Sequence, residues 1–385
     1  MSWDWTFHFE VAFDVDPGTV PAGGDWTDLS GRVRSRLETS RGGRSSRALV
    51  DLNNRDRALD PTNTSATYNL VPLRHARIAV TVDAVRYPLW QGYVENWSPH
   101  WPGYNDATVH VKMVDSFAWL ALQDADLDLP EQTSRERAVA VLDAASWPAG
   151  PRVLIGGISG GKRLDAFQQK SANLLRVLED TADAEDGELF CDAEGRVVFR
   201  HRHWRFDSTS ALTVGASGTP VGSVIPIYDT AWLTNQARVE LANGDTYEWV
   251  DTSSVAAYGP RVFPVRDLSL PPAESEALAQ WVVNRYAEPL LWLDRVELKW
   301  ADPDVDIATV VQIDKGDLVT FTHTPPGGGT VSFAGHVERV ETVAGRGDVS
   351  TFLDLSPYFG EGPWFTLDDA TLGLLGTSAG NKIAP

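Results

Sequence analysis

Sulfur-containing residues are scarce in this chain: there is one cysteine, Cys191, and two methionines in 385 residues. A single cysteine excludes an intramolecular disulfide and a zinc site built from several cysteines, so packing alone must hold the fold. No apolar run reaches the roughly 18 residues of a transmembrane helix. Residues Met1 to Trp5 lack the basic and apolar regions of a secretory signal peptide. We therefore expect no membrane segment and no export by the common route.

Positive charge is also in short supply. The chain has 33 Lys and Arg against 53 Asp and Glu, a formal net charge of −20. A nucleic-acid-binding surface needs clustered Lys and Arg to neutralise phosphates, so this composition disfavours one. The acidity fits either simple solubility or a function that requires a negative surface. The 15 Trp residues suit both cores and interfaces.

The length predicts two to four domains, because a single hydrophobic core rarely grows to this size. From Trp3 to Phe13 every odd position is bulky and apolar, the period-2 pattern of a strand with one buried face. Further strands are predicted at residues 31–40, 47–52, 77–83, 89–97 and 108–114. Short strands at this spacing, separated by turn residues, are typical of a sandwich or barrel.

A weak internal repeat is the most informative pattern. The segment Leu89–Glu95 (LWQGYVE) is answered by Ser332–Glu338 (SFAGHVE). Each follows a short strand-like run (77–81 and 317–321) and precedes another (107–113 and 349–355). The repeat predicts two related antiparallel β-barrels in one chain. Three copies of such a chain could form a ring of six barrels.

The middle of the chain has helical signals. Thr133 and Glu136 fit a capping box, and a second helix is predicted at 171–184, before a hairpin of 188–191 and 196–200. Strands at 237–241 and 246–250 flank Asn243-Gly244, a strong hairpin signal. A further helix is predicted at 273–286.

These elements predict a mainly β protein with an α+β insertion. The expected division is a first barrel at 1–122, an α+β domain at 123–205, a second barrel at 206–357 with an inserted helix at about 270–289, and an arm at 358–385. The arm contains Trp364, Phe365 and several leucines but is too short to enclose a core. We expect it to dock outside its own barrel, on another subunit or the next protein of an assembly.

One segment matches the pattern of a phosphate-binding loop. Gly156–Lys162 reads G-x-x-x-x-G-K, in which backbone N–H groups would cradle phosphates. The next residue must carry a hydroxyl to hold magnesium, and here it is Arg163. A glycine loop that binds no nucleotide is therefore the favoured interpretation.

Two possible metal sites are also disfavoured. His201 and His203 share one face of a strand near Cys191, but Arg196, Arg200, Arg202 and Arg205 would repel a cation there. The segment Asp51–Asp56 resembles a calcium loop, yet it has Arg55 at the fifth position and Asp56 at the sixth, and Thr62 replaces the bidentate Glu. A solvated strand end and a hydrogen-bonded turn are the favoured alternatives.

No pair of carboxylates stands out as a glycosidase pair. Trp97, Trp101 and Tyr104 could stack on a sugar or anchor an interface, and the interface is favoured. We therefore predict no catalytic, cofactor-binding or metal-binding residue.

Several segments taken together resemble one family, the tail hub or minor tail protein of long non-contractile-tailed phages (siphophages) of actinobacteria. The resemblance runs from Asp25 to Pro357. Its residues are Trp26–Val33, Ser40–Arg44, Leu52–Pro61, Tyr68–Arg74, Leu89–Val94, Glu188–Arg200 and Val255–Gly259. It implies two tail-tube-like barrels fused through a small α+β domain in a homotrimer, similar to the baseplate hubs of contractile tails.

The resemblance also implies a place in the virion, at the tail tip. Such a hub would join the sixfold distal tail protein or tail tube protein above to threefold tip or fibre proteins below, with the tape measure protein as a further partner. DNA would pass through the channel without specific binding, and a negative channel would not adsorb it. No enzymatic activity and no cofactor is implied.

Three alternatives make different predictions. A distal tail protein would be a hexamer with one barrel, which leaves 291–355 unexplained. A carbohydrate-binding or receptor-binding module would gather Trp and Tyr in one loop cluster, whereas Trp occurs from Trp3 to Trp364. A P-loop enzyme would need a hydroxyl at Arg163.

Overall fold

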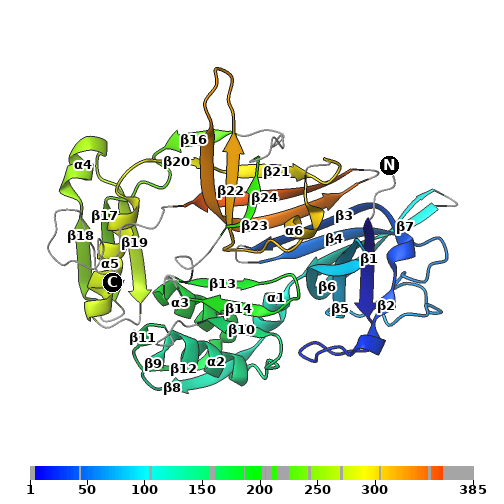
Figure 1. Cartoon of the computed structure of the whole chain (residues 1–385). Coiled ribbons are helices and arrows are strands. Elements are labelled where there is room, and N and C mark those ends of the chain that lie inside the picture. The colour runs from blue at the N-terminus through cyan, green and yellow to red at the C-terminus, as the bar shows by residue number, and fades with distance from the viewer. Residues whose placement is uncertain are drawn as a thin grey trace.

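The structure is a computed structural model (Figure 1). It describes residues 5–42, 45–103, 106–155, 161–185, 187–201, 204, 210–215, 225–241, 244–268, 272–302, 305–345 and 348–358. The fold is mainly β, built on a large and almost entirely antiparallel sheet, with helices concentrated in two smaller α+β units. The predicted fold class, mainly β with an α+β insertion, is confirmed. No described helix is long and apolar enough to cross a membrane.

The large sheet has 12 strands, in the order β15-β22-β23-β3-β4-β7-β6-β5-β1-β2, with β24 pairing both β23 and β21. Its first half consists of β1 (Trp5–Ala12), β2 (Thr27–Asp28), β3 (Val33–Gly42), β4 (Arg47–Asn53), β5 (His75–Val82), β6 (Val85–Gly103) and β7 (Asp106–Val114). Its second half consists of β15 (Ser210–Val214), β21 (Arg295–Lys299), β22 (Leu318–His323), β23 (Val331–Ala344) and β24 (Val349–Pro357). We call these halves the first and second β-units. Short helices, η1 (Gly23–Asp25), η2 (Ser30–Arg32), α1 (Ser116–Leu120) and α6 (Ile307–Val310), connect or flank the strands.

Strand β1 follows the predicted alternation only in part, since Ala12, at an even position, is also fully buried. Phe9 and Val11 are fully buried in the core of the first β-unit. Glu10, on the opposite face, is also largely covered, because it forms ion pairs with Arg77 and Arg86. A charged residue can be covered in this way only when its charge is paired.

The internal repeat corresponds to four strands with the same topology. β4, β5, β6 and β7 pair in the spatial order β5-β6-β7-β4, and β21, β22, β23 and β24 pair in the order β22-β23-β24-β21. The registers match residue by residue: Tyr93 lies opposite Val114 in the first β-unit, and His336 lies opposite Ser356 in the second. Gly92 therefore corresponds to Gly335.

The residues shared by the two copies of the repeat, glycine, valine and glutamate, have a physical explanation. A Cβ atom on Gly92 would lie 2.3 Å from the Val114 carbonyl oxygen, and one on Gly335 would lie 2.9 Å from that of Ser356. Two residues later a fully buried valine, Val94 or Val337, precedes a β-bulge at the glutamate. Glycine thus permits close strand approach, valine fills the core, and the bulge bends the long strand.

The two β-units are joined directly through the sheet. The second half of β23 pairs antiparallel with β3, from Gly42 opposite Arg339 to Leu37 opposite Ala344. Trp300, just after β21, is 1 % exposed and stacks on Phe7 of β1 with ring centroids 5.6 Å apart. The cores of the two halves therefore meet at this joint, a contact that the sequence pattern did not indicate.

The first α+β unit follows β7. It contains β8 (Asp124–Leu129), β9 (Gln132–Thr133), α2 (Ser134–Ala144), β10 (Arg152–Ile155), β11 (Arg163–Leu164), β12 (Phe167–Asn173), α3 (Leu174–Glu185), β13 (Glu188–Cys191) and β14 (Val197–Arg200). The capping box of Thr133 and Glu136 at the start of α2 is confirmed. Both helices pack on the β10-β14-β13 sheet around one core.

A second α+β unit lies within the segment expected to be only a barrel with an inserted helix. β17 (Gln236–Leu241), β18 (Thr246–Val250) and β19 (Val262–Leu268) form a separate three-stranded sheet, accompanied by α4 (Thr252–Tyr258) and α5 (Pro272–Tyr286). The predicted hairpin at 237–250 and helix at 273–286 are therefore present. They pack together in a core that also includes Leu164 and Ala184 of the first α+β unit. The short pair β16 (Pro226–Asp229) and β20 (Leu290–Leu293) brackets this unit.

Replacing Gly92 by Ala tests the explanation of the repeat. The added methyl group must displace backbone at Val114, so we expect a loss of about 1–3 kcal/mol in unfolding free energy. Gly103→Ala, at a position with no heavy atom within 4 Å, is the matched control. Urea denaturation of both variants measures the difference, and equal midpoints would contradict the explanation.

Candidate functional site

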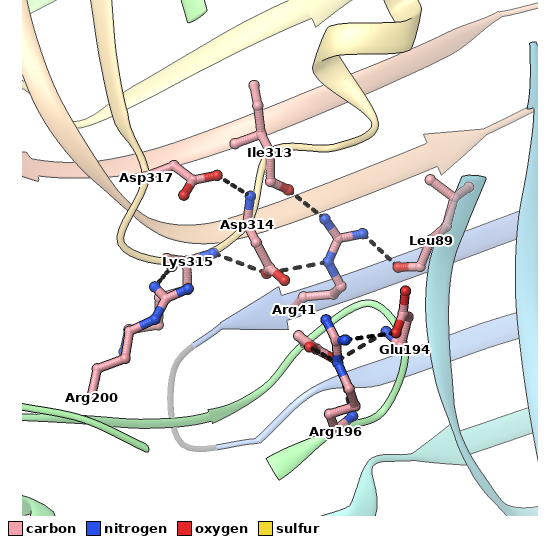
Figure 2. A network of polar contacts seen from close by, with 10 residues as sticks. Arg41, Leu89, Glu194, Arg196, Arg200, Ile313, Asp314, Lys315 and Asp317 are labelled. Atoms are coloured by element: carbon pink, nitrogen blue, oxygen red, sulfur yellow. Dashed lines mark hydrogen bonds and ion pairs between the residues drawn. The ribbon is translucent and has the colours of Figure 1, made fainter. Parts of the chain in front are cut away.

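A buried polar cluster at the joint surrounds Arg41, near the end of β3 (Figure 2). The Arg41 side chain is 1 % exposed. Its Nη1 donates to the Leu89 carbonyl oxygen at 2.5 Å, and its Nη2 donates to that of Ile313 at 2.6 Å. Its Nε lies 3.7 Å from Oδ1 of Asp314. One guanidinium therefore ties β3 and β6 of the first β-unit to the loop before β22 of the second.

The loop that receives Arg41 is held by its own carboxylates. Asp314 Oδ1 accepts from the Lys315 backbone N–H at 2.9 Å, and Asp317 Oδ2 accepts from the Asp314 N–H at 2.8 Å. Burial raises the pKa of Asp314, although the nearby Arg41 opposes that shift. Burial also raises the pKa of Asp317, and the neighbouring Asp314 charge adds to the effect. Because two neighbouring carboxylates repel each other when charged, Asp314 and Asp317 can both stay ionised only with the positive charge of the surrounding arginines.

The first α+β unit contributes the third side of this cluster. Arg200 of β14 donates through Nη1 to the Lys315 carbonyl oxygen at 2.6 Å, and its guanidinium lies 3.6 Å from the ring centre of Trp204. Burial lowers the pKa of Arg200, while Glu188, 3.7 Å away, counteracts the shift. The insertion is thereby fastened to the second β-unit.

The β13–β14 turn fastens the insertion to the first β-unit. Arg196 bonds Asp192 at 2.7 Å and lies 3.0 Å from Glu194 (Figure 2). Gly195, with φ +70°, packs against Gln91 of β6, and its carbonyl oxygen accepts from Ser116 Oγ at 2.8 Å. We call the whole cluster of 41, 188–200 and 313–317 the charged junction. Its chemistry is structural: it fixes how three units of one chain meet.

The phosphate-loop segment is only partly within the described residues, since 156–160 lie outside them. The backbone N–H of Lys162 donates to Glu185 Oε2 at 2.7 Å. Ser134 Oγ donates to the same oxygen at 2.8 Å. In the described end of the loop, the Lys162 N–H is therefore already used by a carboxylate of the same unit. Arg163 pairs with Glu131 at the surface.

The other sequence candidates are mostly structural. Asn53, Asn54 and Asp56 accept backbone N–H bonds within their own turn, and Asp56 pairs with Arg32, which lowers the Asp56 pKa to about 2. These bonds match the predicted turn. Cys191 is buried, and burial raises the pKa of its thiol, while His203 lies outside the described residues. Within the described part of the chain, no group of three His, Cys, Asp or Glu side chains could hold a metal ion.

The aromatic trio is split by the structure. Trp97 is 7 % exposed and stacks on Phe13 in the first core, whereas Trp101 is 54 % exposed. Tyr104 lies outside the described residues. Trp97 therefore cannot stack on a sugar, and Trp101 remains as a surface side chain.

Sequence reasoning assigned no role to Arg41 or Asp314. Arg41 lies in the Ser40–Arg44 segment that carried the resemblance, and Arg200 lies in an arginine-rich stretch. However, Arg41 falls just beyond the strand predicted at 31–40, and Arg200 counted only as a charge that would repel a cation. Their partners are backbone carbonyls up to 272 positions away, which no local pattern indicates.

Comparison with solved structures identifies the fold. A 43 kDa tail protein of prophage MuSo2 from Shewanella oneidensis aligns with a TM-score of 0.61 at 14% identity, over 92% of this chain and 98% of that one. A tail protein from Neisseria meningitidis aligns with a TM-score of 0.62 at 13% identity, over 91% and 96%. An Escherichia coli type VI secretion component, described as similar to the T4 tail proteins gp27 and gp5, aligns at 0.50 and 12% identity, over 84% and 73%. No family model and no curated protein sequence matches. The chain therefore shares its fold with these tail proteins and with this secretion component.

The energetic role of Arg41 can be measured by substitution. Arg41→Met leaves the Leu89 and Ile313 carbonyls without their donor and Asp314 without its cation, so we expect a loss of about 3 kcal/mol. Adding Asp314→Asn should cost less than the sum of the single changes, because the stranded charge is then absent. Arg176→Met, in an exposed helix pair, should change the unfolding free energy by less than about 0.5 kcal/mol. Strict additivity in urea unfolding would contradict the charged junction.

The stability should also depend on pH through Asp115, which is 2 % exposed and caps α1. Burial raises the Asp115 pKa from 3.8 to about 6. The folded state therefore holds this proton more tightly than the unfolded state, and the resulting stabilisation, present at low pH, is lost as pH rises through about 6. Relative to Asp115→Asn, which does not titrate, the wild type should gain roughly 2 kcal/mol between pH 7 and pH 4. Parallel pH profiles of the two proteins would show that Asp115 titrates normally.

Proposed function

We propose that this protein is a structural tail-hub component of a phage virion, a homotrimer that adapts the sixfold tail tube to threefold tip proteins. The observation that carries this is the register-matched duplication of the four strands β4–β7 and β21–β24 in one chain. Three chains with two equivalent β-units each supply the six that a sixfold ring must meet. The likeness to tail proteins in fold supports the same assignment.

The proposed domain division follows the cores. In this division the two β-units form the ring. The α+β unit at 123–205 follows β7 in the chain, and the second α+β unit lies between β16 and β20 in the sequence. The arm at 358–385, of which only residue 358 is described, is proposed to dock on a neighbouring protein. None of these roles requires a catalytic residue or a cofactor.

The proposed partners are those of a tail-tip hub of a siphophage. A distal tail protein or tail tube protein would lie above, tip or fibre proteins below, and the tape measure protein would contact the hub during assembly. Some structures with this fold are complexes of VgrG with PdpA from Francisella, so the fold occurs within multi-protein assemblies. A net charge of −20 per chain supports a channel that lets DNA pass without adsorbing it during ejection into the host.

The alternatives explain less. A distal tail protein would need one β-unit per chain, and this chain has two. A sugar-binding module would need a cluster of exposed aromatic side chains, and Trp97 is a core residue.

The oligomeric state tests the proposal directly. Native mass spectrometry of the full chain at low micromolar and at high concentration should show three copies of the 42.2 kDa subunit. Electrophoresis with duplex DNA at low salt should show no complex. A hexamer would favour the distal tail protein, and tight salt-sensitive DNA binding would contradict a repulsive channel.

A further inference from the structure

The internal repeat extends to the strand that makes the joint. In the first β-unit, Ser40 of β3 lies opposite Arg47 of β4. The matched registers of β4 and β21 place Leu293, at the end of β20, in the position of Arg47. Pro226 of β16 lies opposite Leu293, so β16 occupies in the second β-unit the place that β3 occupies in the first.

The surface that receives β3 also has a counterpart. β3 docks on residues 339–344 of β23, on the side that β22 covers earlier along the strand. The corresponding part of β6 is residues 96–101, because Arg339 matches Asn96 in the registers with β24 and β7. Within the described residues, this part of β6 pairs only with β7, and its other edge carries no strand.

Both edges, which have no partner strand within the part of the chain that the structure describes, have exposed apolar side chains. Ile225, just before β16, is 67% exposed, and Tyr228, within β16, is 68% exposed. On the other edge, Trp101 is 54% exposed and Val71, in the loop before β5, is 45% exposed. Unpaired strand edges with exposed apolar residues are sites of strand addition. Figure 1 places β16 and the β6–β7 hairpin on opposite sides of the molecule, so one chain cannot join its own two edges.

We propose that β16 of one copy pairs antiparallel with residues 97–99 of β6 in the next copy, repeating between chains the β3–β23 joint within each chain. This inference rests on the trimer of the proposed function and names its contact. Because the two edges differ, the contact is head-to-tail and closes into a ring of six β-units from three chains.

The loops beside the two joints correspond as well. The Leu73 N–H donates to the Val94 carbonyl oxygen at 2.7 Å, and the Gly316 N–H donates to that of Val337 at 2.6 Å. Both Leu73 and Gly316 have positive φ, 65° and 86°. Counting back two residues, Val71 matches Asp314.

The central pair of the joint therefore changes character. Within the chain it is the charged pair Arg41 and Asp314. Between chains it becomes the apolar pair Ile227 and Val71, since Ile227 matches Arg41. A β3 edge placed wrongly on another copy's β6 would bury Arg41 against Val71 without a carboxylate, which is costly. The joint within the chain therefore has a charged pair at its centre and the joint between chains an apolar pair, which disfavours pairing of the wrong edges.

The pairing between copies must be shorter than the one within the chain. Gly42 approaches the Glu338 carbonyl so closely that a Cβ would lie 2.3 Å from it, and its counterpart is Tyr228. Pro99 and Pro226 each lack an N–H. We therefore expect three opposed pairs: Ile225 with Pro99, Pro226 with Ser98, and Ile227 with Trp97. Side chains must carry most of the contact.

A disulfide test follows from the matched registers. Ser98→Cys with Pro226→Cys should give covalent trimers on mild oxidation, since the only native thiol, Cys191, is buried. Ser40→Cys with Glu341→Cys, opposed within one chain, should close within the monomer and is the geometric control. A wild-type trimer with a closing control but no link at 98 and 226 overturns this pairing and leaves the proposed function intact.

Surface substitutions provide the second measurement. They test the β16–β6 pairing independently if the control cysteines at 40 and 341 form no disulfide. Ile225→Asp and Val71→Asp should each convert trimer to monomer by native mass spectrometry with an unchanged far-ultraviolet circular dichroism spectrum. Val262→Asp, at a 48% exposed site on β19, should remain trimeric. Trimers of all three variants would overturn the pairing. A wild type that is monomeric at its highest soluble concentration would overturn the trimer itself.

Discussion

The antiparallel contact between β3 and β23 is the interaction on which the rest of the molecule depends. Without it, only side-chain contacts such as those of Arg41 and Trp300 would join the two β-units. With it, one sheet runs through both, and Trp300 and Phe7 bring the two cores together. Main-chain pairing fixes register in steps of one residue, so the angle between the two units is determined by the sheet itself.

The charged junction reinforces that contact at its most buried point. Arg41 is enclosed by the two β-units and reaches carbonyl groups of both, while Arg200 connects the insertion to the same loop. A guanidinium with fixed planar donors is suited to this role, because it can serve several carbonyls in a defined geometry. Such a site gives specificity more than net stability, since burying the charge offsets much of the gain.

Much of the fold could be predicted from local pattern. The alternation of β1, the capping box at Thr133 and the repeat around Gly92 and Gly335 each follow from backbone geometry acting within a few residues. The sequence did not indicate that the second α+β unit is separate from the second β-unit. Strands β17 and β18 have the pattern of an ordinary hairpin, and their sheet is distinguished from the large sheet only by the parallel pairing of β17 with β19. The joint and Arg41 were missed because their partners are distant in sequence. Pairing β3 with β23 has no signal except the repeat itself, which shows that two units exist and not how they meet.

The central claim is that three chains place six equivalent β-units in one ring. The most direct measurement is an electron-microscopy reconstruction of the purified full-length assembly, computed without imposed symmetry. The account predicts a ring that looks sixfold at low resolution and becomes threefold as the two α+β units are resolved, with continuous density alternating between β3–β23 and β16–β6 contacts. A ring with six full chains, or three chains whose β-units do not form one closed ring, would contradict it.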